Sequence, residues 1–244
     1  MADPADPDGP AHGTAAPVEA VDVEALVRAL DGPDADARDA AARALGDLRD
    51  ERAIPALAAA VAAGRGGRGA VWALTQFDDA RIVAPLAAAL SDPDATARAM
   101  AAGKLAELGH PAAVPALIAA LGDGDDHVRE EVARALGRLG DGVALEPLLD
   151  ALRDDRGAHV REEAATAVGA LGAGDSRVVD ALVRAVADAH VAVRRAAAES
   201  LFRMGPMARE RLAQLAAEPS APGREALSAL RGARAPAPGG VPKK

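Results

Sequence analysis

"VPALIAALGDGDDHVREEVARALGRLGD", residues 114–141, is the clearest copy of a unit that recurs along the chain. A close variant starts at Val83 and another at Leu145. All three have an apolar segment, a polar turn, a second segment that opens near an arginine, and an ending in Leu-Gly. Self-similarity at a fixed period is the sequence signature of a repeat architecture.

Two sets of anchor residues fix the period. Leucines of the first segments are 29 to 34 residues apart, and arginines of the second segments are 30 to 33 apart. The leucines are Leu26, Leu57, Leu86, Leu117, Leu148 and Leu182, and the arginines are Arg38, Arg68, Arg98, Arg129, Arg161 and Arg194. A weaker seventh unit contains Leu212, Arg224, Leu227 and Leu230.

Within each unit the apolar residues follow a helical period. Val114, Leu117, Ile118 and Leu121 stand at i, i+3, i+4 and i+7, which predicts one buried helix face. Asp34 and Asp94 lie where they can cap the second helix, and glycines 109, 140, 172 and 205 follow second helices, as is typical of C-caps. A helix pair buries one face alone, so neighbouring pairs must stack. The sequence therefore predicts an all-α solenoid of about seven two-helix repeats.

Composition limits the partners. The formal net charge of −9 disfavours nucleic acid, and one Trp, two Phe and no Tyr leave few residues for stacking on bases. The absence of cysteine excludes disulfides and zinc–cysteine sites. No apolar run approaches the ~18 residues of a membrane span. We therefore expect a cytoplasmic protein without a membrane segment, a cofactor or a small-molecule ligand.

The two ends of the chain differ from the repeats. Residues 1–20 and 232–244 are rich in Pro, Ala, Gly and Asp, and the first of them lack the apolar core of a signal peptide. We expect both to be disordered tails around a solenoid spanning residues 21–231, whose last, degenerate repeat acts as a cap.

Three features resemble the short HEAT-like repeats of phycobilin lyases. Prolines 55, 85, 115 and 147 stand early in first helices, an aspartate precedes the repeat arginine by six residues, and a small or apolar residue precedes it directly. The resemblance spans about residues 22–231 and implies a right-handed superhelix. It also implies that the charged pairs form hydrogen-bonded ladders between repeats and are structural. These residues are Asp92, Arg98, Asp123, Arg129, Asp155, Arg161, Asp188 and Arg194.

His127 and His159 stand two residues before their arginines in consecutive units, with glutamates following. Copies one repeat apart lie about 10 Å from each other, the distance between packed helices. In deoxyhypusine hydroxylase, a HEAT-like enzyme with two irons, the His-Glu ligands follow the arginine directly. Here Glu130-Glu131 and Glu162-Glu163 hold those positions. The sequence therefore argues against a metal site and for a polar helix N-terminus.

Second helices are expected to line the concave face of such a solenoid. The residues one, two, five and nine positions after the arginine are then expected to point outward. In the fourth to sixth units these positions hold charged residues of both signs, with glutamates in the middle of the surface. We interpret this as a surface for a protein with a basic element, with a plainly solvated face as the alternative. Its candidate residues are Glu130, Glu131, Arg134, Arg138, Glu162, Glu163 and Arg195.

The second unit departs from the plan. "GRGGRGAVWALTQF", residues 64–77, replaces the Asp-Pro turn, so the ladder is expected to break there. Alignment on Leu74 places Phe77 in the core and Trp72 on the concave face beside Arg68. Trp72 is then either a binding anchor or a side chain that fills the space left by the short unit.

The sequence favours a non-catalytic scaffold or adaptor that binds a partner protein along the concave face. An alternative, which the family resemblance supplies, is a bilin-lyase-like or lyase-associated protein that handles a tetrapyrrole. A metal-dependent hydroxylase is a third, weaker interpretation.

Overall fold

The computed structural model describes residues 22–65 and 67–217, which form thirteen α-helices and no strand. The first helices of the repeats are α1 (Val23–Ala29), α3 (Ile54–Ala62), α5 (Val83–Ala89), α7 (Val114–Ala120), α9 (Leu145–Asp154), α11 (Ser176–Ala185) and α13 (Pro206–Ala217). The second helices are α2 (Ala35–Leu48), α4 (Gly67–Thr75), α6 (Ala95–Leu108), α8 (Asp126–Leu139), α10 (Ala158–Leu171) and α12 (Val191–Arg203). No helix in these ranges combines the length and apolar character needed to cross a membrane.

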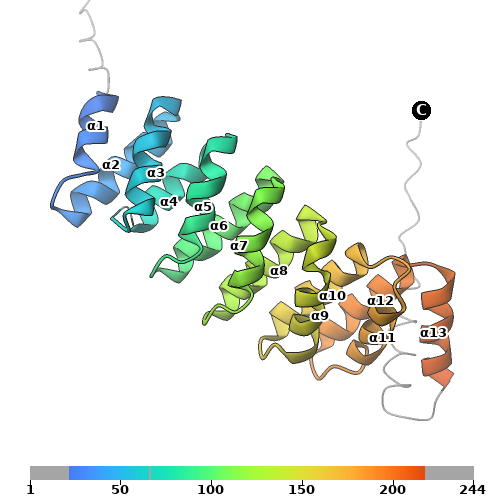
Figure 1. The fold of residues 1–244 in the computed structure, drawn as a ribbon. Coiled ribbons are helices and arrows are strands. Elements are labelled where there is room, and N and C mark those ends of the chain that lie inside the picture. Colours follow the sequence, from blue (N-terminus) through green and yellow to red (C-terminus); the bar gives the residue numbers. More distant parts are fainter. Residues whose placement is uncertain (1–21, 66, 218–244) are drawn as a thin grey trace, which may run out of the picture.

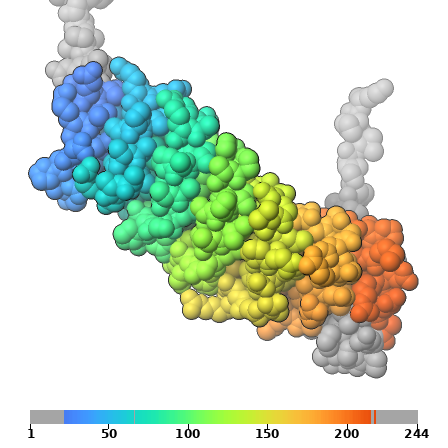
Figure 2. Space-filling view, in the orientation of Figure 1, coloured from blue at the N-terminus to red at the C-terminus, as the bar shows by residue number. Residues whose placement is uncertain are grey.

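The helix pairs stack side by side in chain order, from α1 at one end to α13 at the other (Figure 1). Each second helix contacts the second helix of the next repeat, so α2, α4, α6, α8, α10 and α12 form one continuous layer. The space-filling view shows the same succession of units in an elongated molecule (Figure 2). The predicted α-solenoid is confirmed. The predicted tails and residues 218–231 of the seventh unit lie outside the described residues.

The core is built mainly from small residues and one leucine ladder. The anchor leucines from Leu57 to Leu182 are fully buried, whereas Leu26 at the N-terminal end is half-buried. Ala residues fill most of the space between second helices, as at Ala133 and Ala165, both without exposed surface. Because each small side chain lets helices approach closely, the second-helix layer is tightly packed.

Most of the predicted caps are confirmed. The carboxylates of Asp34 and Asp94 accept the backbone N–H groups of Asp36 and Ala97. Gly109 and Gly140 end α6 and α8 in the left-handed conformation, with φ of 65° and 73°. Gly172 does not: its φ is −101°. The chain needs glycine there because an added Cβ would lie 2.3 Å from Val178 at the start of α11.

Four short 3₁₀ helices between repeats were not predicted. They are η1 (Glu51–Ala53), η2 (Ala80–Ile82), η3 (Pro111–Ala113) and η4 (Gly142–Ala144), and each runs into the next first helix. Asp50, Asp79 and Asp141 cap three of them, and the imidazole of His110 caps the fourth. A capping residue directly before each short segment is the sequence signal that could have revealed them.

Three arginines at the start of second helices bind the carboxylate of the following repeat. Arg98 Nε and Nη2 donate to Asp123 at 2.7 and 2.9 Å. Arg129 binds Asp155 in the same bidentate way, and Arg161 binds Asp188. Bidentate guanidinium–carboxylate pairs combine charge with fixed geometry, so they set the register between adjacent repeats.

The same arginines also hold their own turn, through its backbone. Nη1 of Arg98 donates to the carbonyl of Asp92, and Nη1 of Arg129 to the carbonyl of Asp123. The carboxylate of Asp123 accepts the N–H of Asp125 and faces the preceding repeat. Each arginine therefore pairs with an aspartate one repeat further on, and not with the carboxylate six residues before it.

Burial and hydrogen bonding act in opposite directions on the ladder carboxylates. Burial raises the pKa of Asp155, but the hydrogen bonds from Arg129 and from the Gly157 amide lower it by a larger amount. The pKa of Asp155 therefore lies below its ordinary value. The pKa values of Asp123 and Asp188 are lowered for the same reasons. The ladder is therefore stable in its ionised form.

This sign predicts acid sensitivity. As pH falls, aspartates of the unfolded chain, with a pKa of ~3.9, take up protons before the ladder aspartates of the folded protein do. The ladder therefore stabilises the protein fully above the unfolded pKa, and this stabilisation is lost as pH falls through the lower folded pKa. Urea unfolding measured from neutral to acidic pH should show stability falling steeply in this window. In Asp155→Asn the free energy of unfolding should depend less steeply on pH. Asp150→Asn, which changes an exposed carboxylate, should show the same dependence of stability on pH as the wild type.

The second repeat interrupts the ladder. Helix α4 begins at Gly67, seven residues before Leu74, in the position that Arg98 holds relative to Leu105. Arg38, one repeat earlier, donates Nε to the carbonyl of Arg65 instead of to a carboxylate. Within the described residues the bidentate pairs between repeats thus begin at Arg98. The first two repeats are joined instead by the bond from Arg38 to the Arg65 carbonyl and by the ion pair between Arg65 and Asp31, at 3.0 Å.

Candidate functional site

The outward positions of α8, α10 and α12 form one surface, which we call the second-helix face. It consists of Glu130, Glu131, Arg134, Arg138, Glu162, Glu163, Thr166, Arg195, Glu199 and Arg203. All of these side chains are half-buried or exposed, whereas Val128, Val132 and Leu136 on the opposite side of α8 are fully buried. Because α10 contacts both α8 and α12, charges from three repeats meet on this face.

Arg134 lies at the centre of the acidic part. Its Nη2 donates to Glu130 at 2.7 Å and to Glu163 of the next repeat at 3.0 Å, and its Nη1 donates to Glu131. One guanidinium therefore holds carboxylates from two repeats. Three carboxylates against one guanidinium leave a formal charge of −2 on this cluster.

The cluster keeps Arg134 charged. Burial lowers the pKa of its guanidinium, but the hydrogen bonds that it donates to Glu163 and Glu131 raise it more, so the net pKa lies above the ordinary value of arginine. Arg134 is still partly accessible, with 37% of its side chain exposed. The acidic patch predicted from the sequence is thus a network with an internal cation, open to solvent on one side.

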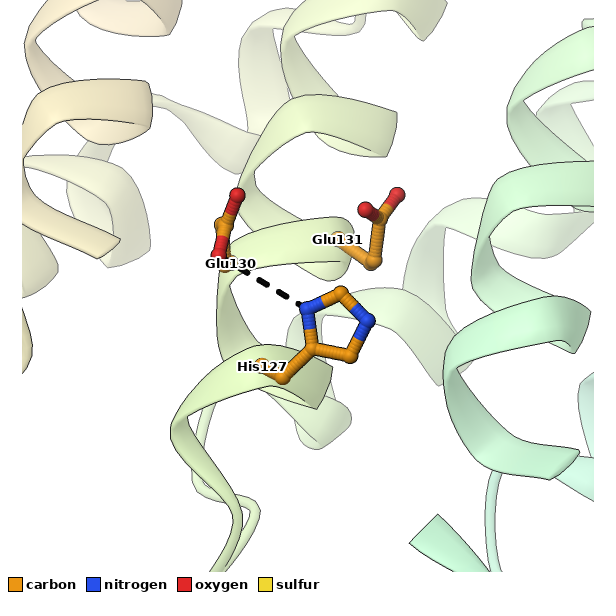
Figure 3. A group of neighbouring side chains, drawn as sticks. All are labelled: His127, Glu130 and Glu131. Atoms are coloured by element: carbon orange, nitrogen blue, oxygen red, sulfur yellow. Dashed lines mark ion pairs between the residues drawn. The ribbon is translucent and has the colours of Figure 1, made fainter. Parts of the chain in front are cut away.

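His127 approaches the same cluster from the first turn of α8 (Figure 3). Its Nδ1 lies 3.7 Å from Oε2 of Glu130, and the ligand atoms of His127, Glu130 and Glu131 all lie within 4.8 Å of one another. One imidazole and two carboxylates are a donor set that divalent metals use. However, Arg134 already binds both carboxylates, so a metal ion would compete with its guanidinium.

The next repeat has a looser version of this arrangement. His159 Nδ1 lies 3.5 Å from Glu162, and Arg195 of α12 lies 3.6 Å from the same carboxylate. Arg195 also approaches Glu199 at 3.8 Å, and its side chain is 69% exposed. Thr166 holds the position of Arg134, so this repeat has no central arginine, and the neighbouring repeat supplies the cation instead.

His190 was not singled out in the sequence, but the structure places it against His159. The two rings meet edge to face with centroids 5.8 Å apart, and Nδ1 of His190 is buried without a hydrogen-bond partner among the described residues. His190 precedes α12, and its backbone N–H donates to the ladder carboxylate of Asp188. The contact arises because equivalent turns of adjacent repeats stack, which single-repeat spacing does not reveal.

Trp72 lies on α4 and is half-buried against the core. Its ring covers Gly46 of α2, where an added Cβ would lie 2.8 Å from Cζ3. The indole therefore fills space at the interface of the first two repeats and also keeps part of its surface open. Arg68 is exposed one turn earlier on α4, and Phe77 is buried in the core as its alignment predicts.

Lys104 of α6 is a buried cation that the sequence did not reveal. Only 8% of its side chain is exposed, and Nζ lies 2.6 Å from Asp78 and 3.5 Å from Glu107. The equivalent positions of α8 and α10 hold Ala135 and Ala167. The stem of Lys104 crosses the packed layer and its charge reaches the surface, a common arrangement for lysine.

Family comparisons agree with this geometry. The family model for HEAT repeats matches residues 83–169, and the model for the PBS lyase HEAT-like repeat matches residues 37–62 and 160–188. The sequence has no significant match among curated proteins.

Several solved structures are similar to this chain. The complex of CpcE and CpcF of phycocyanin lyase from Nostoc is similar over 95% of this chain and 94% of that chain, with 25% identity and a TM-score of 0.52. The YibA protein of Escherichia coli is similar over 81% of this chain and 76% of that chain, with 22% identity and a TM-score of 0.54. Human deoxyhypusine hydroxylase in complex with glycerol is similar over 75% and 83%, with 22% identity, but its TM-score of 0.39 is too low to inform function.

Proposed function

Because the chain is a HEAT-like repeat protein, we propose that it is a non-catalytic scaffold that binds a partner protein along its second-helix face. The observation that carries the proposal is the cluster around Arg134, where carboxylates from two repeats are held in place while facing solvent. A preformed charged surface loses little side-chain freedom on binding, so its complementarity contributes directly to affinity.

The sign of the face favours a basic partner. Four glutamates of the face are each about one-fifth to one-quarter exposed: Glu130, Glu131, Glu162 and Glu163. They outnumber the two arginines that contact them, Arg134 and Arg195. Trp72 is proposed as an apolar anchor two repeats away, using the part of the indole that Gly46 does not cover. Partly exposed tryptophans contribute strongly to protein interfaces.

Affinity capture of partners from the native cells, with the tagged full chain, tests the proposal. Glu130→Lys with Glu162→Lys reverses two charges on the second-helix face. We expect it to weaken capture of the main partner at least about tenfold, since like charges across an interface cost several kcal/mol. Trp72→Ala should also weaken capture.

The matched control reverses two exposed carboxylates on first helices, Asp150→Lys with Asp180→Lys, and changes the net charge equally. This variant should capture as the wild type does. Equal capture by all variants would contradict the second-helix face as the binding surface. Unchanged capture by Trp72→Ala alone would remove Trp72 from it.

A second function is a role in handling a linear tetrapyrrole. The match to the PBS lyase repeat and the likeness to the phycocyanin lyase complex favour it. Against it, the chain has only three aromatic residues of the Phe, Trp and Tyr types and no cysteine. A bilin whose absorption band is unchanged by the purified protein would exclude direct binding of the pigment.

A further inference from the structure

Gly103 differs from the other glycines inside the second helices. An added Cβ would lie 2.8 Å or less from a neighbouring repeat at Gly46, Gly137 and Gly169, so close packing requires glycine at those positions. At Gly103 the nearest atom is Oε2 of Glu131, at 3.9 Å, which is an ordinary contact. Glycine within a helix costs about 0.5 to 1 kcal/mol relative to alanine. Packing of the described residues does not account for that cost.

The position opens onto the second-helix face. Gly103 stands five residues after Arg98, as Arg134 stands five after Arg129, so the two share one register on adjacent helices. Met100 lies one turn before Gly103 and is half-buried against the core, and Glu107 lies one turn after and is 58% exposed. Along α6 the surface therefore has a short apolar floor with a carboxylate at one end.

The wall toward α8 is also acidic. Arg134 binds Oε1 of Glu131, while Oε2 of the same carboxylate is the atom that faces the opening at Gly103. The carboxylates around Arg134 keep a formal charge of −2, and Lys104 of α6 is engaged with Asp78. The opening therefore combines an apolar floor with negative charge at its rim.

We propose that the opening at Gly103 is a subsite for an arginine or lysine side chain of the partner protein. The aliphatic stem would lie on Met100 and Gly103, and the cationic head would bind Oε2 of Glu131. Long basic side chains pack their stems on apolar surface and keep the charge at its edge. The subsite rests on the proposed function and specifies what the partner presents to the second-helix face.

A labelled short peptide of alternating arginine and alanine, measured by fluorescence anisotropy with the full chain, tests the subsite. Gly103→Leu fills the opening without changing any charge and introduces a better helix former, so its melting temperature should not fall. We expect about tenfold weaker binding. Glu131→Gln should weaken binding similarly, and citrulline in place of arginine in the peptide should abolish it.

Ala88→Leu places a leucine at an exposed position of the first helix α5, outside the second-helix face, and should change affinity by less than about twofold. Wild-type affinity in Gly103→Leu would overturn the subsite. If Glu130→Lys with Glu162→Lys abolished peptide binding while Gly103→Leu did not, the subsite would be wrong and the proposed function would stand. Binding of Mn²⁺ or Zn²⁺ that is lost in His127→Ala, without peptide binding, would also overturn it and assign the cluster to a metal.

Discussion

Arg129→Ala is expected to lower the free energy of unfolding by about 3 to 5 kcal/mol, because removing one partner of a buried ion pair leaves the other charge buried and unpaired. Arg129 is 4% exposed, and its partner Asp155 is nearly as buried. The truncation also removes the bond from Nη1 to the Asp123 carbonyl. It therefore loosens both the turn of its own repeat and the register with the next repeat.

Urea unfolding followed by circular dichroism measures this effect. Arg153→Ala is a matched control, since Arg153 also binds two aspartates but is 62% exposed, and exposed pairs contribute less than about 1 kcal/mol. A loss of similar size in both variants would contradict a special role for the ladder.

A double variant separates the charge from the packing. Arg129→Met with Asp155→Leu replaces the buried pair by apolar side chains, and such replacements are often neutral or stabilising. We expect it to recover most of the stability lost in Arg129→Ala. A double variant as unstable as the single one would show that the hydrogen bonds to the turn backbone, and not the uncompensated charge, dominate.

The repeat pattern predicted the helices well because helical periodicity and capping are local. Leu117 and Leu148 are buried as their spacing predicts, and Asp94 caps α6. Ladder pairing is not local. The six-residue spacing of Asp123 and Arg129 suggests a pair between their side chains, but Arg129 donates to the backbone carbonyl of Asp123, and the carboxylate of Asp123 binds Arg98. Only the placement of one repeat on the next decides between these partners.

The candidate site shows the same division. The outward positions of Glu130, Glu131 and Arg134 follow from helix periodicity, but the sequence does not show that one guanidinium joins carboxylates of two repeats. Trp72 is harder still, because its burial depends on Gly46 one repeat earlier. Glycines inside the second helices look alike in sequence, and only the distance to the neighbouring helix separates structural ones from Gly103.

That distinction gives the second large effect. Gly169→Leu is expected to destabilise the protein by about 1 to 3 kcal/mol or more, as overpacking of a tight core does. A Cβ at Gly169 would lie 2.4 Å from Cβ of Ser200 on α12, and the backbone of Ser200 is only 3.4 Å away. Ser200 is fully buried, and its hydroxyl donates to the carbonyl of Ala165 on α10, so the helices cannot separate without losing this bond.

Gly103→Leu is the matched comparison, since it makes the same chemical change in a second helix where the added side chain meets open space. It should leave stability unchanged or raise it by up to about 1 kcal/mol through helix propensity. Hydrogen exchange would locate the damage in Gly169→Leu: amides of α12 and α13 should lose protection while those of α6 and α8 keep it, because solenoid stability comes from nearest-neighbour interfaces. Equal stability of the two variants would mean that the second helices can shift apart at little cost, and the packing argument for an open subsite at Gly103 would then fail with it.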